Sequence, residues 1–371
     1  MGNKVIHNLI HNRVENWMAY NIVLNRMGGI LSMSKAGMHI ISHTDLDGVV
    51  AAAVAWRFHR SLNSPLRVSL AGYGDVDLLV MDSISRGESF LTLDLFCQRD
   101  QTVDEIDRIF HPGEDPLFFD HHQTTIDRHG NRPWVFASTE FCAAKVYFNW
   151  LAANASRNGG VESISGLRDM VDVANDRDLW INRIPESRLW QSLVTLCGPW
   201  PVLMRLAEDP SPVLSVPERS FASAFVSEQE ERFQRALKVA VRSGEDLLFV
   251  EPGTLEFGDV SDFCGLVLDR MDSPPMVAAV LNRRPAGDWN VSLRSREGFA
   301  GRVVGLLRDG KKVRGGGHDD AAALYFPPHF KPGDIRDSLV SAVRTALESD
   351  IPTGLSFGDI LKDAMNEKEM K

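Results

Sequence analysis

The segment His43–Gly48 places one imidazole and two carboxylates at alternating positions directly after a short apolar run. The two acids are Asp45 and Asp47, so three ligands that favour hard cations converge on one small volume. Charges at this density repel one another unless a cation compensates them, and carboxylate with imidazole suits manganese or magnesium better than thiophilic metals. The same pattern fits an ordinary turn whose aspartates cap the next helix. Taken alone, the segment supports both interpretations equally.

A second segment of this kind is Asp120-His121-His122, which follows the apolar Leu117–Phe119. An acid and two neutral imidazoles directly after a buried strand are costly unless something polar is bound there; the alternative is a solvated surface turn. Asp94 likewise ends an apolar run, where an aspartate often does no more than cap the following turn. Each of these segments alone is weak to moderate evidence for a metal site.

A further acidic segment, Asp176-Arg177-Asp178, ends a predicted helix. In isolation this pattern is more typical of a solvated helix end than of a metal site. Its value as evidence therefore depends on the other three segments.

The elements that must position these residues alternate short apolar runs with longer amphipathic stretches, which is typical of βαβ units and a largely parallel sheet. The predicted strands are Met38–Ser42, Leu66–Leu70, Phe90–Leu93 and Leu117–Phe119, and the predicted helices between them are Val49–Arg60, Val76–Ile84 and Thr102–Phe110. Ligands of open α/β sheets bind outside the carboxyl ends of the strands. We therefore expect His43, Asp94 and Asp120 to lie at one edge of the sheet.

The rest of the chain is expected to be helical up to Trp180, then a connector interrupted by prolines, then a long polar helix near 218–242. Apolar runs after residue 245 predict a second, smaller α+β domain. The fold class is therefore α/β, a parallel-sheet domain followed by this α+β domain. The predicted divisions are an N-terminal extension 1–37, a catalytic metal-binding domain 38–185, a helical connector 186–244, a substrate-binding domain 245–345 and a C-terminal tail 346–371.

In this order, the four acidic segments resemble the motifs of the DHH phosphoesterase superfamily. The residues that match are, in motif order, His43-x-Asp45-x-Asp47-Gly48, then Asp94, then Asp120-His121-His122, then Asp176. The segments 291–295 and 314–322 are similar to the DHH-associated C-terminal domain, so the resemblance covers about residues 38–326. The His-x-Asp spacing of the first motif matches the nuclease-like and nano-RNase-like branches better than the pyrophosphatase branch.

The resemblance implies a site for two divalent ions, usually manganese, with magnesium or cobalt as other options. It assigns one ion to His43, Asp45 and Asp94, and the other to Asp47, Asp94, His121 and Asp176, with Asp94 as the bridge. Asp178 is a rival to Asp176. His122 is predicted to contact the phosphate or to protonate the leaving oxygen, with Asp120 orienting nearby groups; the alternative is that His122 only supports a metal ligand.

In the second domain, Gly315, Gly316 and Gly317 precede His318. Three glycines let backbone N–H groups approach an anion that a Cβ would hold away, and Arg294 with His318 could clamp a terminal phosphate or stack on a base. The alternative is a glycine-rich hairpin beside a histidine that is satisfied within the protein. Residues 283–314 contain nine Lys/Arg and three acids, a local charge of +6. This charge favours an anionic ligand.

The chain has 371 residues, enough for about two domains, and a formal charge of −10. This acidic balance opposes binding along duplex nucleic acid. Four cysteines without a C-x-x-C pair argue against a disulfide framework or a zinc knuckle. With no predicted signal peptide and no stretch long enough to span a membrane, we expect a cytoplasmic protein without a membrane partner; a homodimer is one option for its oligomeric state.

The leading functional hypothesis is a manganese-dependent phosphodiesterase similar to the nano-RNase or oligoribonuclease group. It would cleave short single-stranded oligonucleotides or linear dinucleotides to nucleoside monophosphates. The enzymatic alternatives are a phosphomonoesterase acting on adenosine 3′,5′-bisphosphate and a polyphosphatase. A non-catalytic nucleotide-binding regulator is the alternative from another functional class.

Overall fold

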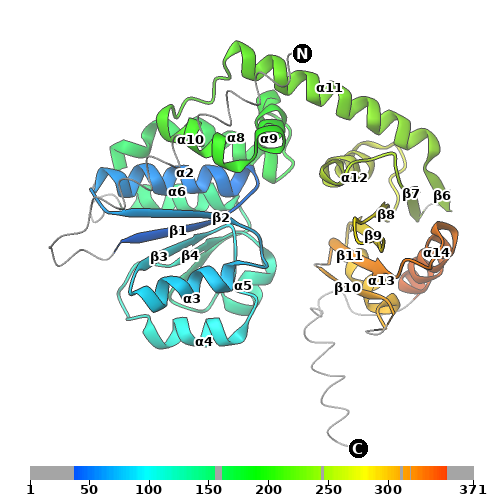
Figure 1. The fold of residues 1–371 in the computed structure, drawn as a ribbon, viewed down its shortest axis with the longest axis horizontal. Coiled ribbons are helices and arrows are strands. Elements are labelled where there is room, and N and C mark those ends of the chain that lie inside the picture. Colours follow the sequence, from blue (N-terminus) through cyan, green and yellow to red (C-terminus); the bar gives the residue numbers. More distant parts are fainter. Residues whose placement is uncertain (1–36, 155–160, 244–245, 310–311, 318, 349–371) are drawn as a thin grey trace, which may run out of the picture. The chain divides into compact units, whose positions relative to one another are not determined.

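The computed structural model describes residues 37–154, 161–243, 246–309, 312–317 and 319–348. The chain divides into two units, Met1–Ala224 and Phe225–Lys371. Each unit contains one sheet, and each is described by itself (Figure 1).

The sheet of the first unit has five strands in the order β2-β1-β3-β4-β5, and every neighbouring pair is parallel. The strands are β1 (Met38–His43), β2 (Leu66–Ala71), β3 (Ser89–Leu93), β4 (Phe118–Asp120) and β5 (Val135–Ala137). The four predicted strands are confirmed, and β5, a three-residue strand at the edge of the sheet, was not predicted. Strand order places β1, β3 and β4 side by side, so the segments that follow them meet at one edge of the sheet.

Helices cover both faces of this sheet, which explains why its central strands β1, β3 and β4 are buried along most of their length (Figure 1). One face is covered by α2 (Leu46–Ser61), α6 (Ala143–Ala153), α8 (Arg168–Asp178), α9 (Pro185–Cys197), α10 (Pro199–Glu208) and the 3₁₀ helix η1 (Val161–Leu167). The other face packs against α3 (Val76–Arg86) and α4 (Asp100–Ile109), and α5 (Gln123–His129) follows β4.

The central helix α2 is buried from Leu46 to Ala55. A helix that is apolar all round belongs in a core, and its small Ala51–Ala55 stretch lets α6, α8 and α10 pack closely on it. This packing fixes the first turn of α2, where the predicted ligands lie, in a rigid setting.

The predicted connector differs from the structure. Pro185 and Pro199 do not interrupt helices; they begin α9 and α10, at the first turn, where a missing N–H costs no hydrogen bond. Both helices bury side chains such as Trp190 and Leu203 in the core of the first unit and therefore belong to that unit. The long polar helix is observed as α11 (Val216–Val239).

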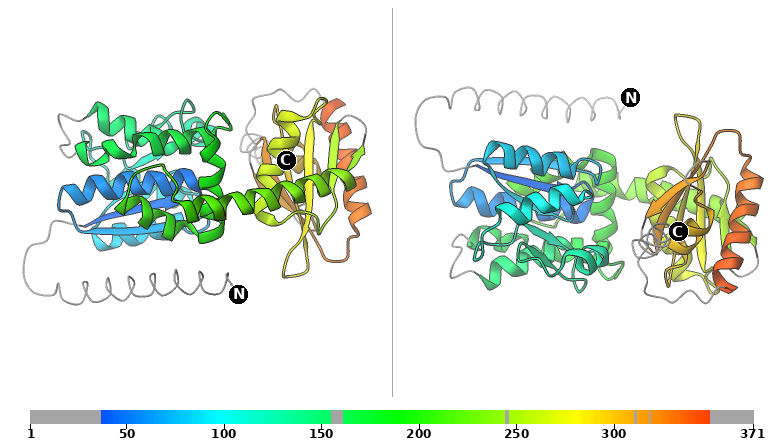
Figure 2. Two further views of the ribbon diagram at one scale, coloured as in Figure 1. Left: turned by 90° about the horizontal axis from the view of Figure 1, so that it is seen from above. Right: turned by 90° about the horizontal axis from the view of Figure 1, so that it is seen from below.

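The second unit has a six-stranded mixed sheet in the order β10-β11-β9-β8-β7-β6. Its elements are β6 (Val241–Ser243), β7 (Leu247–Val250), β8 (Val277–Arg283), β9 (Trp289–Ser295), β10 (Arg314–Gly317), β11 (Ala321–Phe326), α12 (Val260–Arg270), α13 (Phe299–Leu307), α14 (Pro332–Glu348) and the 3₁₀ helix η2 (Phe257–Asp259). Helix α12 packs in one apolar cluster of the sheet, and α13 and α14 pack in another. Figure 2 shows α14 running along the sheet.

The glycines at 315–317 form edge strand β10, which pairs antiparallel with β11 as in the hairpin alternative. Residues 332–348 form helix α14, whose Ile335, Leu339 and Val343 are buried, so an ordered element extends slightly past the predicted tail boundary. Among the helices of the described segments, none combines the length and apolar character needed to cross a membrane.

Candidate metal centre

The turn from β1 into α2 holds the first group of polar side chains. His43 ends β1, and Asp45 caps α2 by accepting a hydrogen bond on Oδ1 from the Gly48 N–H at 3.0 Å. Ser42 Oγ donates to the Gly48 carbonyl at 2.6 Å, and a Cβ on Gly48 would lie 2.5 Å from the His43 carbonyl oxygen. Glycine is therefore required where the helix approaches the strand. The cap leaves Asp45 Oδ2 facing His43 Nδ1 at 3.0 Å, so the residue serves as a cap and also faces the cluster.

Asp94 lies between two sets of ligands. It follows β3 with a φ of +57°, a left-handed conformation that is uncommon outside glycine, and it is 1% exposed. Its Oδ2 lies 3.5 Å from His43 Nδ1, and its Oδ1 lies 3.3 Å from His121 Nε2. The two oxygens of one buried carboxylate thus face two different imidazoles.

The side chains form overlapping groups with ligand atoms within 4.8 Å of one another. The groups are His43/Asp45/Asp94, Asp47/His121/Asp178 and Asp94/His121/His122. In the second group His121 Nε2 lies 3.4 Å from Asp178 Oδ2 and 3.9 Å from Asp47 Oδ2. The third group joins the other two through Asp94 and His121. The structure therefore brings together the predicted His43, Asp45, Asp47, Asp94 and His121.

The fourth predicted ligand requires a correction. Asp176 is buried, but its Oδ1 accepts from the Arg183 N–H at 2.7 Å and its Oδ2 from the Ser187 hydroxyl at 2.8 Å. These bonds tie the end of α8 to the start of α9. Asp178, half a turn further along, is the acid that reaches the cluster. Two residues along a helix change direction by about 200°, so the two aspartates cannot serve the same site.

Asp47 also organises the helix that packs beside it. Its two carboxylate oxygens accept from the backbone N–H groups of Ala143 at 2.7 Å and Ala144 at 2.8 Å, at the start of α6. The positive end of a helix dipole stabilises a carboxylate in this position. Neighbouring Cys142 is buried, and burial followed by the charge of Asp47 raises the pKa of its thiol well above the usual value. Cys142 belongs to none of the ligand groups of the described residues.

The cluster carries more negative charge than its burial allows. Burial, with the charge of Asp94, raises the pKa of Asp47 to about 7, and burial, with the charge of Asp47, raises the pKa of Asp178 to about 7. Burial acts to lower the pKa of His43, but the carboxylates of Asp45 and Asp94 outweigh it and raise that pKa to about 11. Carboxylates that resist ionisation beside imidazoles that attract protons indicate a volume that lacks positive charge.

Several buried atoms in the cluster have no hydrogen bond within the described part of the chain. They are His43 Nδ1, Asp94 Oδ1 and Asp178 Oδ2. Each lies close to another ligand atom, but the angles are not those of hydrogen bonds. Buried polar atoms are almost always paired, so unpaired ones within one cluster need an explanation. Cations held in the ligand groups to which these atoms belong would satisfy them, and the oxygen and imidazole donors fit manganese or magnesium.

Asp120 and His122 form a separate pair at the end of β4. Asp120 Oδ1 accepts from His122 Nδ1 at 2.7 Å and from the His121 N–H at 2.8 Å, and its Oδ2 accepts from Thr125 Oγ1 at 2.5 Å. Burial acts to raise the pKa of Asp120, but the bond to His122 outweighs it and lowers that pKa to about 2. Asp120 is thus placed to orient His122, as its predicted role requires.

Sequence reasoning missed Tyr73, in the loop after β2. Its hydroxyl lies 3.1 Å from His122 Nε2, and its ring centroid lies 5.4 Å from that of His43. The signal that could have identified it is position, because Gly72-Tyr73-Gly74 follows β2 at the same edge of the sheet as the other site residues.

The predicted substrate-binding residues lie in the second unit. Arg294 on β9 donates to the Leu293 carbonyl at 3.0 Å and to Ser261 Oγ at 3.1 Å. A Cβ on Gly315 or Gly317 would collide with β11, whereas a Cβ on Gly316 would meet nothing within 4 Å. Two of the three glycines are therefore explained by strand packing. His318 lies outside the described residues.

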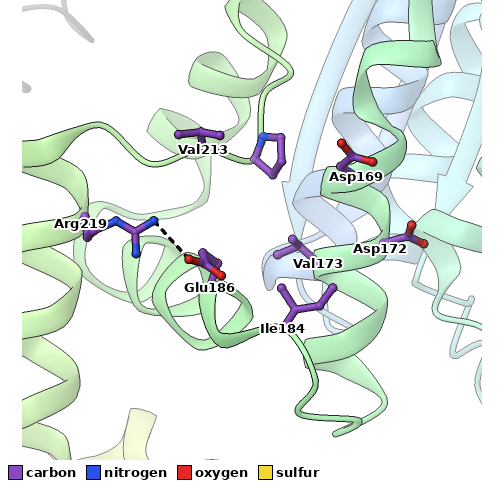
Figure 3. Close-up of a pocket in the computed structure, with 8 residues that line it drawn as sticks. Asp169, Asp172, Val173, Ile184, Glu186, Val213 and Arg219 are labelled. Carbon is purple, nitrogen blue, oxygen red and sulfur yellow. Dashed lines mark hydrogen bonds and ion pairs between the residues drawn. The ribbon is translucent and has the colours of Figure 1, made fainter.

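A cavity of about 370 Å³ lies elsewhere in the first unit (Figure 3). Its lining residues are Asp169, Asp172, Val173, Ile184, Glu186, Pro212, Val213 and Arg219. In the close-up, Arg219 pairs with Glu186, at 3.2 Å. The cavity shares helix α8 with the metal centre, but it contains none of the grouped ligands.

Comparison with known proteins gives structural neighbours only. No family model matches the sequence, and a comparison with curated proteins finds no match. RecJ in complex with Mn²⁺ from Thermus thermophilus is 14% identical with a TM-score of 0.52, over 83% of this chain and 52% of RecJ. An exonuclease RecJ bound to manganese is 17% identical with a TM-score of 0.50, over 85% of this chain and 91% of that one.

A third neighbour is the DHH domain of a protein described as a member of a ribosomal protein family. It is 14% identical with a TM-score of 0.52, over 83% of this chain and 86% of that one. At these identities the likeness concerns the fold, which extends over both sheets of this chain. The prediction from the motifs is confirmed at that level: this chain has the fold of the DHH-domain proteins.

Proposed function

We propose that this protein is a metal-dependent phosphodiesterase that hydrolyses short oligonucleotides or linear dinucleotides to nucleoside monophosphates. The observation that carries the proposal is the placement of Asp94. Its two oxygens face His43 on one side and His121 on the other, at 3.5 and 3.3 Å. A buried carboxylate shared by two groups of ligands is the arrangement that a pair of divalent ions requires.

The residues would divide the ligand set into two. His43, Asp45 and Asp94 would hold one ion, and Asp94, Asp47, His121 and Asp178 the other. Two such ions supply a nucleophile from water near neutral pH and withdraw charge from the phosphoryl oxygens. Asp94 and Asp47, both nearly inaccessible, fix the inner side of the site, whereas Asp45 at 39% and His122 at 29% side-chain exposure leave its outer side open to a substrate.

The comparisons support the choice of manganese as the metal and of a phosphodiester as the bond that is hydrolysed. Two neighbours with TM-scores of at least 0.50 are RecJ proteins with manganese bound, and one of them is described as an exonuclease. Exonucleases hydrolyse phosphodiesters. Manganese is accordingly the ion we propose for this chain, with magnesium as the second choice.

The proposal of a short substrate depends on charge. The formal charge of −10 disfavours binding along a duplex, because such binding requires many phosphate contacts. The basic segment 283–314 and the open Gly316 would provide a small anion-binding subsite, at which Arg294 would contact a phosphate. A subsite of this size suits a few nucleotides.

The test is a manganese-supplemented hydrolysis panel that contains dinucleotides, single strands up to about 20 nucleotides, adenosine 3′,5′-bisphosphate and polyphosphate. We expect nucleoside monophosphate from dinucleotides and short strands, with falling rates as length grows. Hydrolysis of only the bisphosphate or only polyphosphate would replace the proposal with a phosphomonoesterase or a polyphosphatase. Failure on every substrate, with nucleotide binding retained, would indicate a regulator.

A further inference from the structure

The hydrogen bonds around His122 determine where its proton lies. Asp120 Oδ1 is an ionised carboxylate oxygen and can only accept, so Nδ1 of His122, at 2.7 Å, must carry the hydrogen. In the neutral imidazole Nε2 then has a lone pair and accepts from the Tyr73 hydroxyl at 3.1 Å. The three residues form one chain from Asp120 through His122 to Tyr73.

This chain ends at the metal ligands. The Tyr73 ring lies beside His43, a member of one ligand group, and beside His122, next to a member of the other. Since both nitrogens of His122 have partners within the protein, the Tyr73 oxygen is the last polar atom of this hydrogen-bonded chain. In serine hydrolases an acid and an imidazole in this order move the proton of a hydroxyl group that is itself the nucleophile; here the hydroxyl at the end of the chain belongs to Tyr73.

We propose that Tyr73 is a catalytic residue, which exchanges protons with the substrate on behalf of His122. As the P–O bond breaks, the Tyr73 hydroxyl gives its proton to the leaving oxygen, and the attacking water, on the opposite side of phosphorus, releases its own proton to solvent. A proton taken from solvent at His122 Nε2, with Asp120 stabilising the imidazolium, then passes to the Tyr73 oxygen and restores its hydroxyl. Tyr73 and His122 end as they began. This inference rests on the proposed function.

The first test examines the hydrogen bonds from Asp120 through His122 to Tyr73 and does not depend on enzymatic activity. In metal-free protein, ¹⁵N NMR of the imidazoles distinguishes Nδ1 from Nε2. We expect His122 to be protonated at Nδ1, and we expect Tyr73→Phe, which keeps the ring and removes the hydroxyl, to shift the Nε2 resonance. An unchanged Nε2 resonance, or a proton that resides on Nε2, would contradict the proposed hydrogen bond from Tyr73 to His122.

The second test compares two leaving groups with manganese present. A nucleoside alkoxide needs a proton to leave, whereas p-nitrophenolate does not. We expect Tyr73→Phe to lower kcat about 100-fold on a dinucleotide and less than about 10-fold on a p-nitrophenyl ester of a nucleoside phosphate. Equal losses on both substrates, or none on either, would contradict a proton-transfer role.

Two controls separate this role from a structural one. Tyr147, buried in the core, provides the matched variant Tyr147→Phe, which should leave the ratio of the two rates unchanged. In a His122→Ala background, Tyr73→Phe should have no further effect, because the chain is already broken. If the wild type cleaves the dinucleotide and Tyr73→Phe does not change the ratio of the rates on the two substrates, the Tyr73 proposal fails and the proposed function stands. If the wild type cleaves no phosphate ester, the proposed function fails, and the NMR experiment still tests the hydrogen bonds of His122.

Discussion

Asp94 combines burial, a left-handed backbone and two imidazole neighbours, and each feature contributes to a bridging role. A non-glycine residue at φ +57° carries a conformational cost, although aspartate and asparagine tolerate this region better than other residues. Its backbone N–H donates to the Phe119 carbonyl at 3.0 Å, which holds the turn. The strain is therefore retained at the point where the two ligand groups meet, as is common at functional sites.

The two aspartates at the end of α8 give the sharpest prediction at this scale. Asp178→Ala should lower manganese affinity more than about 100-fold, because it removes a ligand, and leave metal-free stability unchanged or higher. Asp176→Ala should instead cost about 1–3 kcal/mol of unfolding free energy, because it leaves the Arg183 N–H and the Ser187 hydroxyl without a partner. Calorimetric titration and urea unfolding measure both quantities. The reverse pattern would restore Asp176 as the ligand.

At the scale of elements, the site depends on how closely α2 approaches β1. Gly48→Ala would place a Cβ 2.5 Å from the His43 carbonyl, so backbone must shift where three ligands originate. We expect a loss of about 1–3 kcal/mol in stability together with weaker manganese binding. Gly333→Ala, also in the first turn of a helix, meets nothing within 4 Å and is the matched control. Equal effects of the two substitutions would refute the argument from close approach.

β1 also carries a buried histidine that makes stability depend on pH. His39 is fully buried between Ser83 Oγ at 2.6 Å and Ser69 Oγ at 2.9 Å. Burial, followed by the charge of Arg67, lowers its pKa from 6.5 to about 4. The unfolded chain then binds more protons than the folded one between these values, so this contribution to stability is present above pH 6.5 and is lost as the pH falls toward 4.

The size of the effect follows from the pKa difference. At about pH 5 His39 should reduce the unfolding free energy by about 2 kcal/mol relative to about pH 7. Urea unfolding with a chelator, at both pH values, should show that His39→Gln loses about that much less than the wild type over the same interval. An identical pH dependence in the variant would show that His39 is not protonated on unfolding.

Much of the arrangement of the strands and of the site at their ends could be predicted from the sequence. Apolar runs ending in acids predicted β1 to β4, and parallel topology then predicted that His43, Asp94 and Asp120 share an edge. The choice between Asp176 and Asp178 could not be made, because it depends on which face of α8 turns toward the strands. The choice between an anion-binding segment and a hairpin at glycines 315–317 could not be made either, because only the contact with β11 shows that two of them serve strand packing.

For the whole molecule, part of the negative net charge comes from the aspartates of the candidate metal centre. The cluster gathers Asp45, Asp47, Asp94 and Asp178 around three imidazoles, and two divalent ions would bring the formal charge from −10 to −6. The remaining charge still disfavours long duplexes.

Ion binding should therefore stabilise the folded chain. Manganese at about 100 times its dissociation constant should add about 2.7 kcal/mol per site and raise the melting midpoint measured by scanning calorimetry. The variant Asp94→Asn, which retains a residue that tolerates the left-handed backbone, should show little or no rise. A rise of equal size in both proteins would place the stabilising ion elsewhere.

The central claim is that one carboxylate joins two ion sites, and manganese stoichiometry tests it most directly. Isothermal titration calorimetry on the chelator-treated full chain should give two Mn²⁺ per wild-type chain, and Asp94→Asn should lose high-affinity binding at both sites. A wild-type stoichiometry of one or zero, or two ions still bound tightly by Asp94→Asn, would contradict the account.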